Sequence, residues 1–153
     1  MFNTDNLQII PGTDIRLREK AKEVADPADP LVANLVKQMT KTLQANNGVG
    51  LAAPQVGQAV RIFVAEIDYE LYAMINPKIK NLSRDTVEME EGCLSFPGVF
   101  KPITRSKKVT VTYFDLGGEK KTLKARGLLA RVIQHEYDHL DGVLFVDLVK
   151  RAG

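Results

Sequence analysis

The side chains best suited to bind a metal ion fall in two short segments of the chain. Cys93 is the only cysteine and lies within Glu91–Ser95, while the only two histidines, His135 and His139, lie within Gln134–His139. Because the chain uses these side chains nowhere else, we expect them to gather around one metal ion. One thiolate and two imidazoles leave a tetrahedral divalent ion with one open position, which is typical of a catalytic rather than a structural site.

The spacing of the two histidines suits a helix. His135 and His139 are four residues apart, so both imidazoles project from one face of a helix expected at 127–140. Glu136 lies about 100° further round that helix. It can therefore reach a water at the metal and exchange a proton with it, without ligating the metal itself. Taken alone, an H-E-x-x-H pattern also fits two surface histidines on a charged helix face.

The third ligand separates the possible classes of metal enzyme. No Glu follows His139, which excludes the metallopeptidases whose third ligand is a downstream Glu. The pattern H-E-x-x-H-x-x-G-x-x-H is matched by Gly142, but Phe145 stands where its last histidine should be. Cys93 is the remaining candidate ligand, and the alternative for a free cysteine is a small buried hydrophobic residue.

Size and composition set the limits for the other functions. The chain of 153 residues predicts a single domain over residues 1–153, and its 44% hydrophobic and 26% charged content is ordinary for a soluble protein. A net charge of +2 is too small for a nucleic-acid surface, and no apolar stretch is long enough to span a membrane. The polar start of the chain argues against a signal peptide, and a lone cysteine forms no internal disulfide. We therefore expect a cytoplasmic protein that binds neither nucleic acid nor membrane.

Two helices are predicted. The first begins at Asp29-Pro30, ends at Asn46-Asn47-Gly48, and carries apolar residues at helical spacing, namely Val32, Leu35, Val36, Met39 and Leu43. The second covers 127–140, with Gly142 as its expected C-cap and an apolar stripe of Leu129, Val132, Ile133 and Leu140.

Four strands are predicted between and after these helices. They cover 60–67, 71–75, 109–114 and 121–125; Asn76-Pro77 is expected to break the chain after the second, and a turn at 116–119 joins the last two. Strands and helices are segregated rather than regularly alternating. This favours an α+β fold, one compact domain with a mostly antiparallel sheet packed around a central helix that carries the H-E-x-x-H residues.

A glycine-rich segment at 48–55 allows two interpretations. It contains G-x-G-x-x-A, and Asp68 lies twenty residues beyond its first glycine, so a dinucleotide fingerprint is formally present. Such glycines should follow a strand and open a helix. Here they follow a predicted helix, and Pro54 and Gly57 oppose a new one. A plain structural turn gives no reason for Gln55.

Together, three segments resemble the peptide deformylase family. The family patterns G-φ-G-φ-A-A-x-Q (φ apolar), E-G-C-L-S and Q-H-E-x-D-H-L occur complete and in this order at 48–55, 91–95 and 134–140, and weaker likeness extends over most of the chain, including 14–18. The resemblance implies a metal-dependent hydrolase that removes the N-formyl group from the initiator N-formylmethionine of nascent polypeptides and releases formate.

The resemblance also implies roles for individual residues. It assigns Cys93, His135 and His139 to the metal, Glu136 to general acid–base catalysis, and the Gln55 amide with the Leu94 backbone N–H to an oxyanion hole. Residues expected at the substrate are Gly48, Val49, Gly50, Met89, Glu91 and Val132, of which Val49, Met89 and Val132, with Leu94, are candidates for a methionine pocket or for plain core. Gly50 is expected to let substrate backbone come close, as strand addition would require.

The metal and the partners follow from the same resemblance. Fe(II) is the expected ion, with zinc, nickel or cobalt as alternatives between which a Cys-His-His set does not choose. The expected partners are N-formylmethionyl nascent peptides in bacterial-type translation, whether in a bacterium, an organelle or a phage, and the protein is expected to be a monomer.

This chain departs from many relatives at two places. Phe100 stands where they carry an Arg seven residues after the cysteine, which puts substrate-backbone contacts there in doubt. The chain stops fourteen residues after His139, so any ribosome contact is expected to be weak or made elsewhere.

Two other functions are compatible with parts of the pattern. A metallopeptidase or amidase with a different substrate is disfavoured by the incomplete third-ligand patterns. A non-catalytic binding homologue would be expected to have lost Glu136, Gln55 or a ligand, and all are present.

Overall fold

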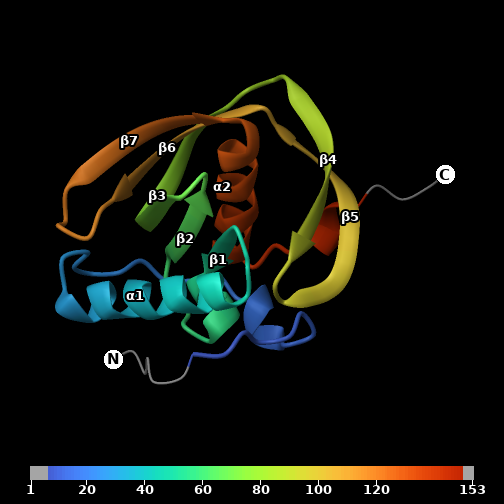
Figure 1. Cartoon of the computed structure of the whole chain (residues 1–153). Coiled ribbons are helices and arrows are strands. Elements are labelled where there is room, and N and C mark those ends of the chain that lie inside the picture. Colours follow the sequence, from blue (N-terminus) through green and yellow to red (C-terminus); the bar gives the residue numbers. More distant parts are fainter. Residues whose placement is uncertain (1–6, 150–153) are drawn as a thin grey trace.

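Two α-helices and seven strands form within residues 7–149, the part of the chain that the computed structural model describes (Figure 1). The predictions that concern 1–6 and the tail at 150–153 lie outside the described residues. Within 7–149, no helix is long and apolar enough to cross a membrane. The helices are α1 (Pro30–Ala45) and α2 (Gly127–Leu140), and the strands are β1 (Gly50–Ala52), β2 (Ile62–Ile67), β3 (Glu70–Leu82), β4 (Thr86–Cys93), β5 (Phe96–Ser106), β6 (Lys108–Phe114) and β7 (Lys120–Arg126).

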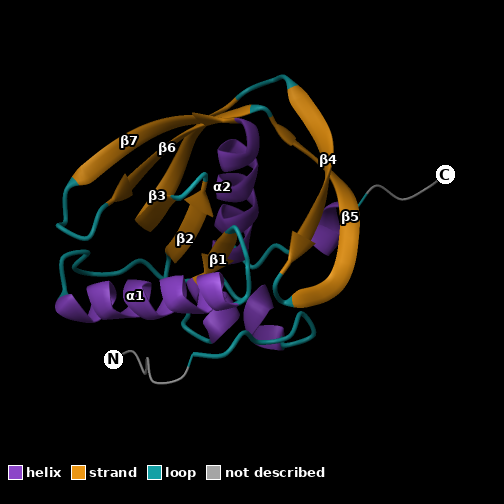
Figure 2. Cartoon of the chain, in the orientation of Figure 1, coloured by secondary structure: helices purple, strands orange, loops and turns teal. Residues whose placement is uncertain are grey.

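The strands form two separate sheets. Five of them make an antiparallel sheet in the order β1-β2-β3-β6-β7, with β1 at one edge, and β4 and β5 form an antiparallel hairpin of their own. Figure 2 shows α2 standing between the five-stranded sheet and this hairpin. This is the predicted α+β architecture, with the H-E-x-x-H residues on the central helix.

The two helices cover opposite faces of the large sheet. The apolar residues predicted for α1 are all buried, and they pack with Ile62 and Val64 of β2. Phe63, between them in sequence, points to the other face and joins the cluster that contains Ile133 of α2. Successive side chains of a strand point to opposite faces, so β2 is buried on both sides and holds the two helices in place.

The helix ends agree closely with the predictions. Asp29 caps α1, with its carboxylate accepting a hydrogen bond of 2.9 Å from the N–H of Leu31. Helix α2 ends at Leu140, Asp141 is its C-cap, and Gly142 follows with a φ of 73°. Gly142 is therefore one residue beyond the cap position predicted for it, in the left-handed conformation that glycine adopts without strain.

The predicted strand break at Asn76-Pro77 is wrong. Strand β3 runs through both residues, and its pairing with β6 shifts register between Ile75 and Lys78. Asn76 has a φ of 50°, and its side-chain amide makes two hydrogen bonds of 2.8 Å with the backbone of Val24. A β-bulge leaves one residue outside the ladder, so a proline without an N–H is tolerated there.

Four elements around the site were not predicted, namely β1, the 3-10 turn that follows it, β4 and β5. Cys93 is the last residue of β4, and Leu94-Ser95 make the turn to β5. Few of the hairpin's side chains are buried, so it lacks the apolar alternation that reveals a strand. The glycine segment enters β1 and then one 3-10 turn at Ala53–Val56. Pro54 is tolerated at the start of this turn, although the sequence argued against a helix there.

Candidate active site

The three predicted ligand residues converge at one point between α2 and the hairpin. The donor atoms of Cys93, His135 and His139 all lie within 4.8 Å of one another, and Cys93 Sγ is 3.4 Å from His139 Nε2. Metal–sulfur and metal–nitrogen bonds of about 2.3 and 2.1 Å in a tetrahedral site place such atoms roughly 3.6 Å apart. A thiolate with two imidazoles is a donor set for iron, zinc, cobalt or nickel, so these residues fit one divalent ion.

Glu91 orients the first histidine. His135 Nδ1 lies 2.8 Å from Glu91 Oε1, and since a carboxylate accepts, Nδ1 donates and Nε2 is left for a metal ion. Burial alone would raise the pKa of Glu91, but hydrogen bonds from His135 and Arg105 outweigh it and lower that pKa to about 2. Glu91 is therefore a carboxylate at any physiological pH.

The two histidines differ in how readily they lose a proton. Burial lowers the pKa of His139 well below its ordinary value of 6.5, which keeps this imidazole neutral and ready to ligate. For His135, hydrogen bonds with Cys93 and Glu91 outweigh burial and raise the pKa to about 10. A metal ion must therefore compete with a proton for His135.

Glu136 is buried beside the ligand cluster. Burial raises the pKa of this carboxyl to about 7, although the positive charges of His135 and Arg105 oppose the shift. Its Oε1 is enclosed and has no hydrogen-bond partner among the described residues. A carboxyl that titrates near neutrality with one oxygen uncommitted can accept and return a proton.

Gly50 has a structural reason to be glycine. A Cβ built there would lie 2.5 Å from Glu136 Oε2 and 2.8 Å from Val132 Cγ1. The close neighbours of this glycine are thus Glu136 and Val132 of α2. The sequence predicted a close approach by the substrate backbone and did not predict these two contacts. Because Gly50 has no side chain, the edge strand β1 can lie directly against Glu136, the carboxyl that can accept and return a proton.

The amide of Gln55 is held in one orientation. Its Oε1 accepts a hydrogen bond of 2.9 Å from the N–H of Ala52, so its Nε2 points toward the ligand cluster. There Nε2 lies 3.4 Å from Cys93 Sγ and donates to Ser95 Oγ at 3.2 Å. Gln55 is only 1% exposed, so a non-titrating donor is fixed beside the candidate ligands.

A cleft of about 570 Å³ opens onto this cluster. Its walls come from the glycine segment 46–50, from the hairpin and from α2. Every residue predicted for the site lines it except His139, which lies deeper and is 1% exposed. The predicted residues that line it are Gly48, Val49, Gly50, Gln55, Met89, Glu91, Cys93, Leu94, Val132, His135 and Glu136.

The four pocket candidates differ in their burial, and Leu94 both lines the cleft and packs against the apolar core. Val49 and Met89 are 46% and 45% exposed, so their side chains face the cleft and are not plain core. Val132 is buried and contributes to the wall behind Gly50. Phe100 also lines the cleft, and its ring lies over Gly92, where a Cβ would be 2.8 Å from the ring. An aromatic ring therefore occupies part of the cleft rim beside the cysteine.

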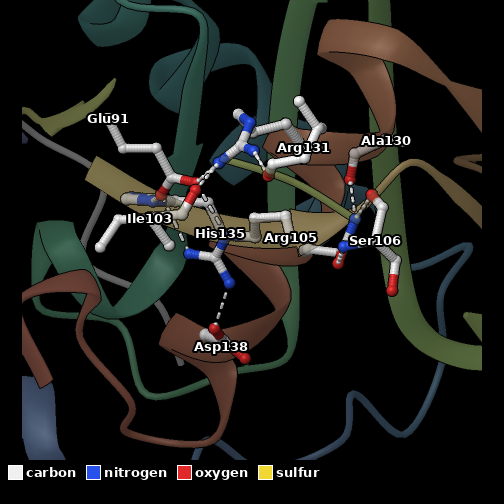
Figure 3. A network of polar contacts seen from close by, with 10 residues as sticks. Glu91, Ile103, Arg105, Ser106, Ala130, Arg131, His135 and Asp138 are labelled. Atoms are coloured by element: carbon white, nitrogen blue, oxygen red, sulfur yellow. Dashed lines mark hydrogen bonds and ion pairs between the residues drawn. The ribbon is translucent and has the colours of Figure 1, made fainter. Parts of the chain in front are cut away.

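A polar network behind the candidate ligands was not predicted from the sequence. Figure 3 shows the guanidinium groups of Arg105 and Arg131 meeting at the carboxylate of Glu91, and Arg105 also reaching Asp138. Burial raises the pKa of Asp138, and its hydrogen bond with Arg105 opposes that shift. Arg131 stands four residues before His135, a helical spacing that could have marked it as a neighbour of the ligand.

Comparisons with known proteins give one consistent result. The family model described as polypeptide deformylase matches residues 6–153. A peptide deformylase of Dictyoglomus turgidum is 49% identical over 131 residues, which cover 86% of this chain and 84% of that protein. The crystal structure of peptide deformylase from Thermotoga maritima superposes with a TM-score of 0.92 at 41% identity, covering 95% of this chain and 98% of that one. A Synechococcus elongatus peptide deformylase in complex with actinonin gives 0.92 at 43% identity, covering 95% and 80%.

Proposed function

Because the chain belongs to the polypeptide deformylase family, we propose that the cluster between α2 and the hairpin is the centre at which it removes the N-formyl group from nascent polypeptides. The protein is a metal-dependent amide hydrolase. The observation that carries the assignment of residues is the convergence of three ligand atoms within 4.8 Å, beside a buried Glu136 and a fixed Gln55 amide.

Cys93, His135 and His139 would hold the divalent ion, which supplies a Lewis acid that activates water at neutral pH. Glu136 takes the proton of the attacking water on its uncommitted oxygen and gives it to the amine that leaves. Burial of Glu136, which raises its pKa to about 7, suits both transfers, since the group is neither too weak a base nor too weak an acid at neutral pH.

Negative charge develops on the formyl oxygen when water adds to the formyl carbon. We assign its stabilisation to Gln55 Nε2 and to the backbone N–H of Leu94, which follows Cys93 at the hairpin turn. Both donors belong to groups fixed before the reaction, so they need no reorganisation as the charge appears.

The substrate backbone would add to the free edge of β1, because β1 is the edge strand of the large sheet and Gly48–Gly50 line the cleft. In this arrangement the side chain of the first residue enters the part of the cleft lined by Met89 and Val132. An unbranched, flexible methionine side chain suits such an apolar, irregular space.

Fe(II) is our proposal for the native ion, with zinc, nickel or cobalt as substitutes that the same three ligands accept. The proposed setting is the compartment where bacterial-type translation starts chains with formylmethionine. We propose that the protein acts there as a monomer on nascent peptides, with at most weak contact to the ribosome.

The decisive experiment measures formate release from a formyl-Met-Ala-Ser peptide by protein loaded anaerobically with Fe(II), with nickel-loaded and metal-stripped protein alongside. Formate release by the loaded forms alone, with internal peptide bonds intact, would support the proposal. Internal cleavage, or full metal occupancy with no formate from any formyl-Met peptide, would refute it.

Replacing Gln55 by alanine is expected to lower kcat by about 10²–10³-fold with little change in bound metal, because one donor to the developing oxyanion is lost. Steady-state kinetics of formate release, with metal content determined on the same samples, would check this. A matched control is Gln58→Ala, since Gln58 follows the same 3-10 turn but does not line the cleft. Equal kinetics for the two variants would remove Gln55 from the mechanism.

A further inference from the structure

The three candidate ligands come from two parts of the fold, the β4–β5 hairpin and α2, that share no backbone hydrogen bond. Cys93 belongs to the β4–β5 hairpin, which is a separate sheet, whereas His135 and His139 belong to α2. Among the described residues, no backbone-to-backbone hydrogen bond joins the hairpin to α2. The distance between the thiolate and the imidazoles therefore depends on the side chains that fix the hairpin to the helix, together with the backbone bond of 2.7 Å from the Gly12 N–H to the Ser95 carbonyl at the hairpin turn.

One face of α2 supplies these side chains. They occur at positions i, i+3, i+4 and i+7 of the helix, and we call them the polar stripe: Arg131, Gln134, His135 and Asp138. Gln134 pairs with the backbone of Ser106 in both directions, at 3.1 and 2.9 Å. Asp138 accepts from Arg105 of β5 at 2.6 Å.

Arg131 makes the most extensive of these contacts. Its Nη1 donates to Glu91 Oε2 and, at 3.0 Å, to the carbonyl of Ile103, while its Nη2 donates to the carbonyl of Val87 at 2.7 Å. Val87 lies on β4 and Ile103 on β5, so one guanidinium group binds both strands of the hairpin. Arg131 is only 5% exposed, which shields these bonds from water.

The same group reaches the ligands through Glu91. This carboxylate receives Arg131 on Oε2 and His135 on Oε1, so the arginine and the ligand histidine share one anchor on β4. Arg105 crosses the junction in the opposite direction, from β5 to Asp138 of α2. The planar guanidinium fork fixes direction as well as distance, which a lysine ammonium does not.

We propose that Arg131 is a positioning residue that sets the place of Cys93 relative to the two imidazoles, by fixing the β4–β5 hairpin on α2. Its hydrogen bonds go to Glu91 and to the hairpin backbone rather than to Cys93, His135 or His139. Its effect is on the affinity and geometry of the metal site. This inference rests on the proposed ligand set but not on the substrate, so metal binding tests it directly.

The test compares Arg131→Met and Arg131→Lys with a matched control, Arg61→Met. Arg61 is also a buried arginine bound to α2: it donates to the carbonyl of Leu140 at 2.8 Å and pairs with Asp141. Among the described residues its partners are Ala21, Leu140, Asp141 and the ring of Tyr137, which all lie outside the hairpin, so its loss removes a buried arginine without loosening Cys93. Each cobalt-loaded protein is examined by its visible absorption spectrum and by the rate of cobalt release into excess EDTA.

Arg131→Met is expected to release cobalt roughly 10–100-fold faster than the unchanged protein and to show altered ligand-field bands. The cobalt release rate of Arg131→Lys should lie between these two rates, because lysine keeps the positive charge but lacks the planar guanidinium group. Arg61→Met should keep the spectrum and release rate even where its melting temperature falls.

Several outcomes would overturn the inference. Release rates and spectra that match between Arg131→Met and Arg61→Met would show that the hairpin is held without Arg131, and would leave the deformylase assignment intact. If Arg131→Met does not fold, an unchanged release rate and spectrum in Arg131→Lys would have the same meaning. Failure of the unchanged protein to take up cobalt would overturn the ligand set together with this inference.

Discussion

Glu136→Ala is expected to lower kcat/KM for a formyl-methionyl peptide by about 10²–10⁴-fold, the usual contribution of a positioned general acid–base group. The carboxyl is buried, its Oε1 has no partner among the described residues, and its pKa of about 7 suits proton exchange at neutral pH. Because Glu136 is not among the clustered ligands, the variant should hold as much metal as the unchanged protein.

Metal content and formate release, measured on the same nickel-loaded samples, separate this effect from metal loss. Glu136→Gln keeps the volume of the side chain and should lose activity to a similar extent, since an amide does not accept and return a proton. Glu88→Ala changes an exposed carboxylate on β4 outside the cleft and should leave the rate unchanged. Near-normal turnover in Glu136→Gln with full metal occupancy would mean that another group moves the proton.

Glu91→Gln is expected to lower the free energy of unfolding by about 3–5 kcal/mol, because it leaves a buried arginine without its counter-charge. Glu91 is 6% exposed and receives both Arg105 and Arg131. Arg105 keeps its ion pair with Asp138, but among the described residues Arg131 pairs with no carboxylate other than Glu91. Urea unfolding of the metal-stripped proteins at pH 7 would measure the difference without a contribution from metal binding.

Glu91 also makes the free energy of unfolding depend on pH, in a direction that follows from its lowered pKa. Its pKa in the folded protein is lowered to about 2 from 4.5, so the folded state binds the proton less readily than the unfolded state. The stabilisation is fully present above pH 4.5 and is lost as the pH falls toward 2. Unfolding free energies of the unchanged protein and of Glu91→Gln should therefore converge over this range. Glu88→Gln, exposed on the same strand, should stay within about 0.5 kcal/mol of the unchanged protein at each pH. A constant gap between the unchanged protein and Glu91→Gln from pH 7 to 2.5 would contradict the assignment.

Local sequence was sufficient for the two helices, and it pointed to the cysteine and the two histidines that cluster in the structure. The apolar spacing in α1 and α2 is a property of the helix itself, and both helices begin and end close to where their caps predicted. His135 and His139 share a face because they are four residues apart, whatever surrounds them. The use of one cysteine and two histidines in the whole chain already suggested a single metal site.

Tertiary structure decided the rest of the site. Strand β3 continues through Asn76-Pro77 only because its pairing with β6 admits a bulge and Val24 receives the asparagine amide. The β4–β5 hairpin has little apolar alternation because polar bonds to α2 hold it, and such bonds leave no periodic trace in a sequence. The position of Cys93, the direction of the Gln55 amide and the convergence of two arginines on Glu91 all depend on groups far apart in the chain. Contacts of this kind form only when the elements pack, so their geometry became visible only in the folded structure.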